Sequence, residues 1–289
     1  MVQELAESSY VMGHTSDEID RLVEQSSQFR TQSELLLRAA GLAPGMRVLD
    51  IGCGPGDLSI LAARLVGTGE VVGVDNALDA IEIARSRALR DGLSNVSFEL
   101  CDVTQLDPAP AWLTAGAFDA VIGRYVLMHL PDASGCLRAL VRYAKQDAIF
   151  TFQELDTRSA ESDPPGALFG RSVQRLQNAL RVAQVEQRSG SSLARTFRAA
   201  GLPEPEVLLT ASIESATPDA YVFRHTAETT RTLLPLITRA GIATADEVDI
   251  STLEARLRDE ALQTTSTLTN VALVGAWTRL TPRSTIRAR

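Results

Sequence analysis

The fold of this chain is decided by the stretch VLDIGCGPGD, residues 48–57. Its first residues are mostly β-branched or apolar, a pattern that predicts a buried strand. Three glycines then alternate with other residues at Gly52, Gly54 and Gly56, and the run LSILAARL (58–65) carries apolar residues at helical spacing. A glycine-rich turn between a strand and a helix lets the backbone approach a ligand and aims helix N–H groups at it. The stretch therefore predicts a ligand-binding loop.

The spacing and charge of this loop narrow the ligand. In the dinucleotide fingerprint G-x-G-x-x-G, the third glycine falls where this chain has Asp57. Asp50 and Asp57 flank the loop, and two carboxylates would repel a pyrophosphate but suit a ligand that carries an ammonium and a sulfonium. The loop therefore predicts a cationic nucleoside, and a nicotinamide dehydrogenase is disfavoured.

Residues 45–155 alternate short β-branched runs with helical patterns, which is typical of βαβ units and a parallel sheet. The expected strands are VLDIG (48–52), VVGVD (71–75), VSFEL (96–100), DAVIG (119–123) and AIFTF (148–152), and the expected helices are 58–65, 77–92 and 134–144. We therefore predict an α/β fold, a Rossmann-like doubly wound sheet that is mostly parallel with an antiparallel last strand.

The flanking sequence predicts added helices. Residues 15–41 read as a helix opened by a capping box of Thr15 and Glu18, and ESDPPG (161–166) reads as a break before helices near 167–186 and 191–200. PEVLLTASIES (205–215) and TLTNVALVGAW (267–277) each read as one strand. Between them, Thr217 with Pro218 and Ser251 with Glu254 predict helix starts within 218–262. The expected domains are an N-terminal helical lid (1–41), a cofactor-binding core (42–156), and the rest of the sheet (157–289) with inserted helices (about 167–200 and 218–262) as a substrate cap.

The composition limits the partners and the compartment. Lys plus Arg number 28 against 36 Asp plus Glu, which leaves a net charge of −8 and disfavours nucleic acid and anionic lipid as partners. Three unclustered cysteines argue against a disulfide framework. The first residues lack a signal pattern, and no apolar run approaches the roughly 18 residues of a membrane span. We therefore expect a cytoplasmic protein without a membrane partner, and we keep a homodimer open.

At this point the residues support a resemblance. VLDIGCGPG resembles motif I of the class I S-adenosylmethionine-dependent methyltransferases, and the similarity extends over 45–155. It implies S-adenosylmethionine as cofactor, with the methionine portion against the glycine loop and its amino end near Asp50. It also implies that Asp75 binds the ribose hydroxyls and Asp102 the adenine amino group. VIGRYVLMHL (121–130) resembles the fourth-strand motif. The implied cofactor-binding set is Asp50, Gly52, Gly54, Asp75, Asn76, Asp102, Val103, Gly123 and Arg124.

The same resemblance implies that Tyr125, Met128 and His129 lie on the acceptor side of the site. Methyl transfer needs a base only if the acceptor carries a proton, and His129 is the first candidate because its motif lies beyond the fourth strand. A structural role for His129 remains open. Tyr10 and His14 are the next candidates, since they precede a helix that folds over the cofactor in similar enzymes. No spaced Asp and Asp-Asn set of the magnesium-dependent type occurs, so no metal is expected.

The predicted function is methyl transfer to a small-molecule acceptor, a specialised metabolite, because the added helices supply walls but no basic groove. The fourth-strand sequence Gly-Arg-Tyr also differs from the Pro-Pro-Tyr type, which methylates macromolecules. An alternative keeps the cofactor but uses its sulfonium for a rearrangement or cyclisation without methyl transfer. A non-catalytic binding module would need a blocked glycine loop, and this loop is intact. The sequence does not identify the acceptor atom.

Overall fold

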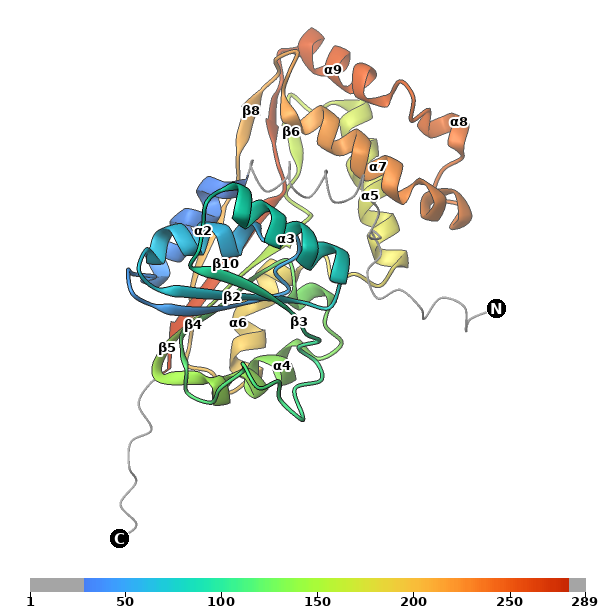
Figure 1. Ribbon diagram of the computed structural model, residues 1–289. Coiled ribbons are helices and arrows are strands. Elements are labelled where there is room, and N and C mark those ends of the chain that lie inside the picture. The colour runs from blue at the N-terminus through green and yellow to red at the C-terminus, as the bar shows by residue number, and fades with distance from the viewer. Residues whose placement is uncertain (1–28, 281–289) are drawn as a thin grey trace. The chain divides into compact units, whose positions relative to one another are not determined.

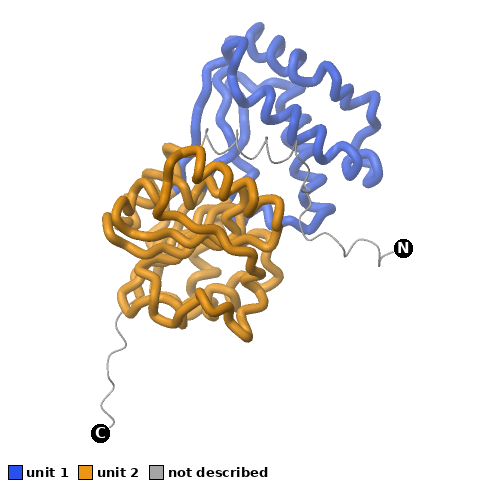
Figure 2. The backbone as a smooth tube through the Cα atoms, viewed as in Figure 1, with its two compact units in different colours: residues 1–21, 155–189, 209–273 blue, residues 22–154, 190–208, 274–289 orange. Residues whose placement is uncertain are grey.

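The computed structural model describes residues 29–280 of the chain. These residues form two compact units, which are coloured separately in Figure 2. One unit comprises residues 29–154, 190–208 and 274–280, and the other comprises residues 155–189 and 209–273. The second unit is therefore built from two separate insertions into the first.

Seven strands form the main sheet: β1 (Arg47–Ile51), β2 (Glu70–Asp75), β3 (Val96–Leu100), β4 (Phe118–Arg124), β5 (Ala144–Asp156), β7 (Glu206–Thr210) and β10 (Ala272–Arg279). Their order is β3-β2-β1-β4-β5-β10-β7, and the five strands from β3 to β5 pair in parallel. β10 runs antiparallel to β5, because its end meets the start of β5 through Leu280 N and Ala148 O, 2.9 Å apart. The predicted fold class is confirmed.

Helices cover both faces of this sheet (Figure 1). They are residues 29–40, α2 (Asp57–Val66), α3 (Leu78–Arg90), α4 (Ala133–Leu140) and α6 (Ser189–Ala199), with 3-10 turns η2 (Leu127–His129) and η3 (Val141–Tyr143). Successive strand residues point to opposite faces. Accordingly, buried Val48 packs in a cluster with α2 and helix 29–40, whereas buried Leu49 packs with α4 and α6. Burial on both faces explains why the parallel strands are almost continuously apolar.

The second unit has its own sheet and core. Short strands β6 (Glu161–Asp163), β8 (Ile213–Ser215) and β9 (Thr267–Thr269) pair antiparallel in the order β6-β9-β8. The helices α5 (Ala167–Val182), α7 (Tyr221–Arg239), α8 (Ala245–Val248) and α9 (Leu253–Thr264) share a hydrophobic core that includes Leu268 of β9. Glu260 of α9 accepts bonds from Leu168 N (2.8 Å) and Phe169 N (3.0 Å), which satisfies free N–H groups at the start of α5.

Two expected strands are wrong as single elements. Residues 205–215 form β7 and β8, and residues 267–277 form β9 and β10, with one strand of each pair in each sheet. Asn270 lies at the break between β9 and β10, where its backbone N–H donates to Ser212 O (3.0 Å) and its side chain bonds Ser212 Oγ and Glu214. Alternating hydrophobicity predicts a strand but does not identify the strand with which it pairs. The sequence analysis therefore missed the division into two sheets.

The expected helix starts also need correction. α7 begins at Tyr221, not at Pro218, and α9 begins at Leu253, where Ser251 donates to Asp249 (2.8 Å) rather than capping the helix. The capping box lies earlier, at Thr244 and Glu247 of α8. The capping box predicted at 15 and 18 lies outside the described residues. The helix at 189–199, predicted within the substrate cap, has Leu193 and Phe197 in the core of the main sheet.

No helix between residues 29 and 280 combines the length and apolar character needed to cross a membrane.

Candidate cofactor site

The three glycines of the loop after β1 have different neighbours. All three adopt a left-handed backbone, with φ of 61° at Gly52, 52° at Gly54 and 85° at Gly56. A Cβ on Gly52 would lie 2.4 Å from Val126 Cγ2, and one on Gly56 would lie 2.9 Å from Ala84 Cβ. A Cβ on Gly54 would meet nothing within 4 Å. Gly52 and Gly56 therefore allow close packing within the protein, whereas Gly54 leaves room for a ligand against the backbone.

Asp75, at the end of β2, faces this loop. Its Oδ2 accepts a hydrogen bond from Gly54 N (2.8 Å), and its Oδ1 accepts one from Ala77 N (2.9 Å). Each carboxylate oxygen has a second lone pair, so both oxygens retain the capacity to accept from ligand hydroxyls. The Asp75 carboxylate and the open side of Gly54 therefore meet at one place, although 21 residues separate them. Asn76, predicted beside it, is exposed.

Asp50 is fully buried in β1. Its Oδ2 accepts from Ser59 Oγ of α2 (2.6 Å), and its Oδ1 has no hydrogen-bond partner among the described residues. Burial raises the pKa of Asp50 to about 7, against the lowering effects of the Ser59 bond and the positive charge of Arg124. A buried acceptor atom without a partner is uncommon. Its free lone pairs fit the amino group that the sequence predicted near this residue.

Asp57 does not offer the free charge that the sequence analysis used. Arg87 of α3 forms an ion pair with Asp57 (2.5 Å) and also donates to Pro55 O (2.7 Å). These bonds fix the start of α2 to α3. The Asp57 charge is thereby paired, whereas Asp50 has a fully buried oxygen without a hydrogen-bond partner among the described residues.

The predicted residues at the end of β4 divide into two kinds. A Cβ on Gly123 would lie 2.8 Å from Phe152 and Val126, so this glycine permits packing within the sheet core. Arg124 donates to Ser33 Oγ (3.1 Å), and Ser33 in turn donates to Gln153 Oε1 of β5 (2.7 Å). Arg124 is therefore held by the helix at 29–40. Ser33 and Gln153 carry no motif, and sequence reasoning missed them.

Asp102 and Val103 follow β3. The Asp102 carboxylate accepts from Thr104 N (2.9 Å), Thr104 Oγ1 (2.7 Å) and Gln105 Nε2 (2.8 Å). Partial burial would raise the pKa of Asp102, but these bonds outweigh it and lower the pKa below its ordinary value. Val103 packs against the main core. The turn holds Asp102 as a carboxylate, and its assigned contact with adenine remains a prediction.

His129 ends η2, on the same segment as Val126. Burial lowers the pKa of His129 to about 4, well under the value near 6.5 that an exposed imidazole has. The side chain is therefore neutral at pH 7 and can accept a proton, but its conjugate acid is strong. Tyr10 and His14, the other predicted bases, lie outside the described residues.

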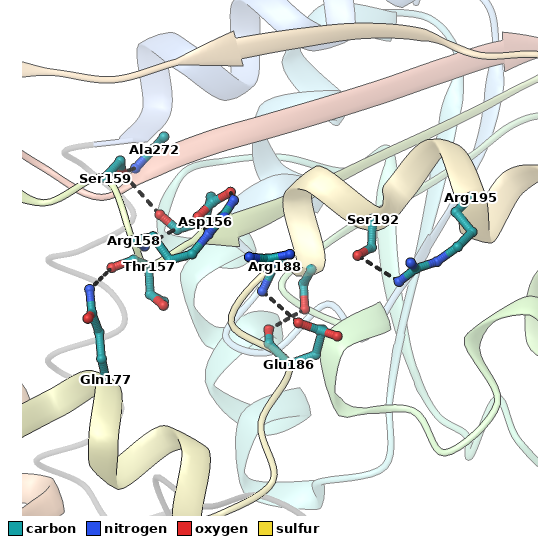
Figure 3. Close-up of polar contacts among 11 residues, drawn as sticks. Asp156, Thr157, Arg158, Ser159, Gln177, Glu186, Arg188, Ser192, Arg195 and Ala272 are labelled. Carbon is teal, nitrogen blue, oxygen red and sulfur yellow. Dashed lines mark hydrogen bonds and ion pairs between the residues drawn. The ribbon is translucent and has the colours of Figure 1, made fainter. Parts of the chain in front are cut away.

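Two acids lie at the end of β5, the edge where open α/β sheets place ligands. Glu154 is fully buried, and Asp156 pairs through both oxygens with Arg158 (2.8 and 2.5 Å). Figure 3 shows the Arg158 guanidinium against Asp156, and Ser159 bound to Ala272 N (2.5 Å). Asp156 thus stabilises the turn after β5, whereas Glu154 binds the backbone of the segment after β4.

Comparison with known protein families supports a cofactor site at the ends of β1 and β2. A family profile described as a methyltransferase domain matches residues 42–201, more than half of the chain. The chain belongs to the class I S-adenosylmethionine-dependent methyltransferases. S-adenosylmethionine is its cofactor. The open side of Gly54 and the unpartnered Asp50 Oδ1 fit this molecule.

Individual relatives of this methyltransferase agree over part of their length. The aklanonic acid methyltransferase DauC of a Streptomyces species is 45% identical over 101 residues, which are 35% of this chain and 42% of DauC. A ubiquinone biosynthesis O-methyltransferase of Neisseria meningitidis is 32% identical over 112 residues, 39% of this chain and 45% of the relative. The chain thus matches less than half the length of both relatives.

A solved structure supports the fold over nearly the whole chain. The putative sarcosine dimethylglycine methyltransferase from Galdieria sulphuraria has a TM-score of 0.53 at 14% identity, and it covers 96% of this chain and 94% of its own. At this identity the similarity concerns the fold. Among residues 29–280, no group of three or more His, Cys, Asp or Glu side chains could hold a metal ion.

Proposed function

We propose that this protein transfers a methyl group from S-adenosylmethionine to a small-molecule acceptor of specialised metabolism. The observation that carries the proposal is that the Asp75 carboxylate binds the backbone of Gly54, where a Cβ would meet nothing within 4 Å, while the neighbouring strand holds a buried Asp50 with an unpartnered Oδ1. The acceptor class is supported by relatives named for aklanonic acid and for ubiquinone biosynthesis.

The residues of the chain would bind and orient the reactants. When bound, S-adenosylmethionine supplies a methyl group on a positively charged sulfur. The free oxygen of Asp50 can accept from the ammonium of the methionine end, and the positive charge of Arg124 suits its carboxylate. Asp75 would accept from ribose hydroxyls. Catalysis then consists mainly of alignment of nucleophile, methyl and sulfur with exclusion of water, and a protonated acceptor would give its proton to neutral His129.

Formation of S-adenosylhomocysteine tests the proposal. The full chain would be incubated with S-adenosylmethionine and either aromatic polyketide or quinone-precursor acceptors, and products would be followed by mass spectrometry. Methylated acceptor with equimolar S-adenosylhomocysteine is expected. An altered acceptor without S-adenosylhomocysteine would instead establish rearrangement or cyclisation. Methylation of RNA in a parallel reaction, without any small-molecule product, would contradict the proposed acceptor class.

Asp75→Ala is expected to weaken S-adenosylmethionine binding by about 1–3 kcal/mol, the range for loss of a charged hydrogen-bond partner. The substitution removes acceptors for the ribose and also frees Gly54 N, which Asp75 now binds. Isothermal titration calorimetry measures the affinity. Asp79→Ala is the matched control, because Asp79 is an exposed carboxylate on the following helix. Equal affinities for the Asp75 variant and the wild type would refute this role.

His129→Asn is expected to lower turnover by about 10-fold to 100-fold with little change in cofactor affinity. This is the lower part of the usual range for a general base, because the pKa of about 4 makes the imidazole a weak proton acceptor. For the same reason the rate that depends on His129 should be flat between pH 6 and 9. A loss smaller than threefold would assign His129 to the wall of the site.

Two further expectations are part of the proposal: a cytoplasmic location, and a lid and a substrate cap formed by residues 1–41 and by the inserted helices of about 167–200 and 218–262. A homodimer stays open. Removal of residues 1–20 would test the lid by comparing activity with thermal stability.

A further inference from the structure

The segment between β4 and α4 begins with a strained residue. Tyr125 has φ of 58°, a left-handed conformation that a bulky side chain rarely adopts. Its backbone N–H still donates to Gln153 O of β5 (2.9 Å), so the turn starts directly at the sheet edge. Burial raises the pKa of Tyr125, and its hydroxyl has no hydrogen-bond partner among residues 29–280. Such strain persists only where surrounding bonds determine the conformation.

Glu154 supplies those bonds from the neighbouring strand. Its Oε1 accepts from Val126 N (3.1 Å) and from Leu127 N (2.7 Å), the two residues directly after Tyr125. The Glu154 side chain is fully buried, and its Oε2 has no hydrogen-bond partner in the described chain. Successive N–H groups that converge on one oxygen fix the local backbone direction. Glu154 therefore holds the turn in its strained form.

The side chain of Val126 connects this turn to the cofactor loop. Val126 Cγ2 lies 2.4 Å from the place of a Cβ on Gly52, and Val126 Cγ1 lies 2.8 Å from the place of one on Gly123. Val126 therefore packs directly on the backbone of both glycines. Because buried side chains are closely packed, a shift of Val126 would leave the Gly52 turn unsupported.

We propose that Glu154 is a positioning residue for cofactor binding, which acts through Val126 by holding that side chain against the backbone of Gly52. The proposal rests on the cofactor site described above and assigns to Glu154 no contact with the cofactor. The pKa of Glu154 is raised to about 8 by burial, against the bonds from Leu127, Val126 and Met128. At pH 7 the side chain is therefore mostly a neutral acid, and glutamine reproduces its accepting oxygen.

Calorimetric titration of the full-length protein with S-adenosylhomocysteine at pH 7 tests this role. Glu154→Gln should retain the wild-type affinity within about twofold, because an amide oxygen replaces Oε1. Glu154→Leu, which has a similar volume and no acceptor, should bind at least tenfold more weakly. In hydrogen exchange, the amides of Val126 and Leu127 should be faster in the leucine variant alone. Thr151→Val is the matched control, since buried Thr151 lies on the same strand with an unpartnered hydroxyl.

Failure of the wild type to bind would contradict the cofactor site itself. Wild-type binding with equal affinity in the leucine variant would overturn the positioning role alone, and so would equal losses in the glutamine and leucine variants. If the leucine variant does not fold, Val126→Ala replaces it, because it keeps the backbone bonds to Glu154 and removes the Cγ2 methyl group that lies nearest to Gly52. That variant should bind at least fivefold more weakly, and unchanged affinity would overturn the proposal.

Discussion

Gly52→Ala is expected to weaken S-adenosylhomocysteine binding by at least about 100-fold, or roughly 3 kcal/mol. The added Cβ would lie 2.4 Å from Val126 Cγ2 and 2.8 Å from Val126 Cβ, and the Cβ atom of Val126 cannot move away without a shift of its backbone. The backbone must also keep φ near 61°, which alanine adopts only at a cost. Overpacking and strain together should lower the free energy of unfolding by about 2–4 kcal/mol.

Substitutions at two other glycines distinguish overpacking from backbone strain as causes of the lost affinity and stability. Gly54→Ala has a similar φ but no neighbour within 4 Å, so it should reduce affinity strongly while stability falls by only about 1 kcal/mol. Gly92→Ala, at φ of 67° and also without a close neighbour, should cost similar stability and leave binding unchanged. Calorimetry and urea unfolding measure both quantities. Wild-type affinity in the Gly52 variant would show that Val126 and the loop move apart freely.

The free energy of unfolding is expected to fall as the pH rises from 4 to 8. Burial raises the pKa of Asp50 from 3.8 to about 7, so the folded state retains a proton that the unfolded state has lost. The stability linked to this proton is present below pH 4 and is lost as the pH rises through 7. At about 1.4 kcal/mol for each pKa unit, the loss from Asp50 reaches up to about 4 kcal/mol. Glu154, raised from 4.5 to about 8, acts with the same sign. His129, lowered from 6.5 to about 4, acts with the opposite sign between pH 4 and 6.5 by up to about 3 kcal/mol, which the two acids together exceed.

Asp50→Asn should reduce this pH dependence, because an amide does not ionise. Urea unfolding of the wild type and the variant at pH 5, 6, 7 and 8 provides the measurement, and the variant should gain about 2–3 kcal/mol relative to the wild type across this range. Asp102→Asn is the matched control: hydrogen bonds lower the pKa of Asp102, so its titration lies below this range. Parallel curves for wild type and Asp50→Asn would show that Asp50 is ionised in the folded protein.

Residues close in sequence account for the parts of the fold that were correctly predicted. The strand starting at Val48, the turn at Gly52 and the helix behind it depend on side-chain periodicity and on backbone freedom within one short stretch. Asp75 was found because the end of a parallel strand has a defined edge, whatever the rest of the chain does. The family resemblance followed from the same residues, and the structure has the predicted loop between a parallel strand and a helix.

The local pattern did not contain the information for the corrected elements. Residues 205–215 and 267–277 alternate as strands do, but each divides between two sheets because Asn270 bonds residues 212 and 214 from the other stretch. The sequence analysis treated Asp57 as a free charge, but in the structure it pairs with Arg87 of α3, which lies 30 residues later in the chain. Pairing of this kind depends on which elements pack together.

The sequence by itself determined the βαβ core, the glycine loop and the acids at the strand ends, because these depend on spacing within about ten residues. Only the tertiary structure decided the protonation of the buried acids and the packing that holds the glycine loop. Desolvation raises the pKa of Asp50 and Glu154 and lowers that of His129, and the extent of burial is set by distant segments. Likewise, the contact of Val126 with Gly52 joins residues 74 positions apart. Only tertiary packing connects Glu154, through Val126, with the cofactor loop.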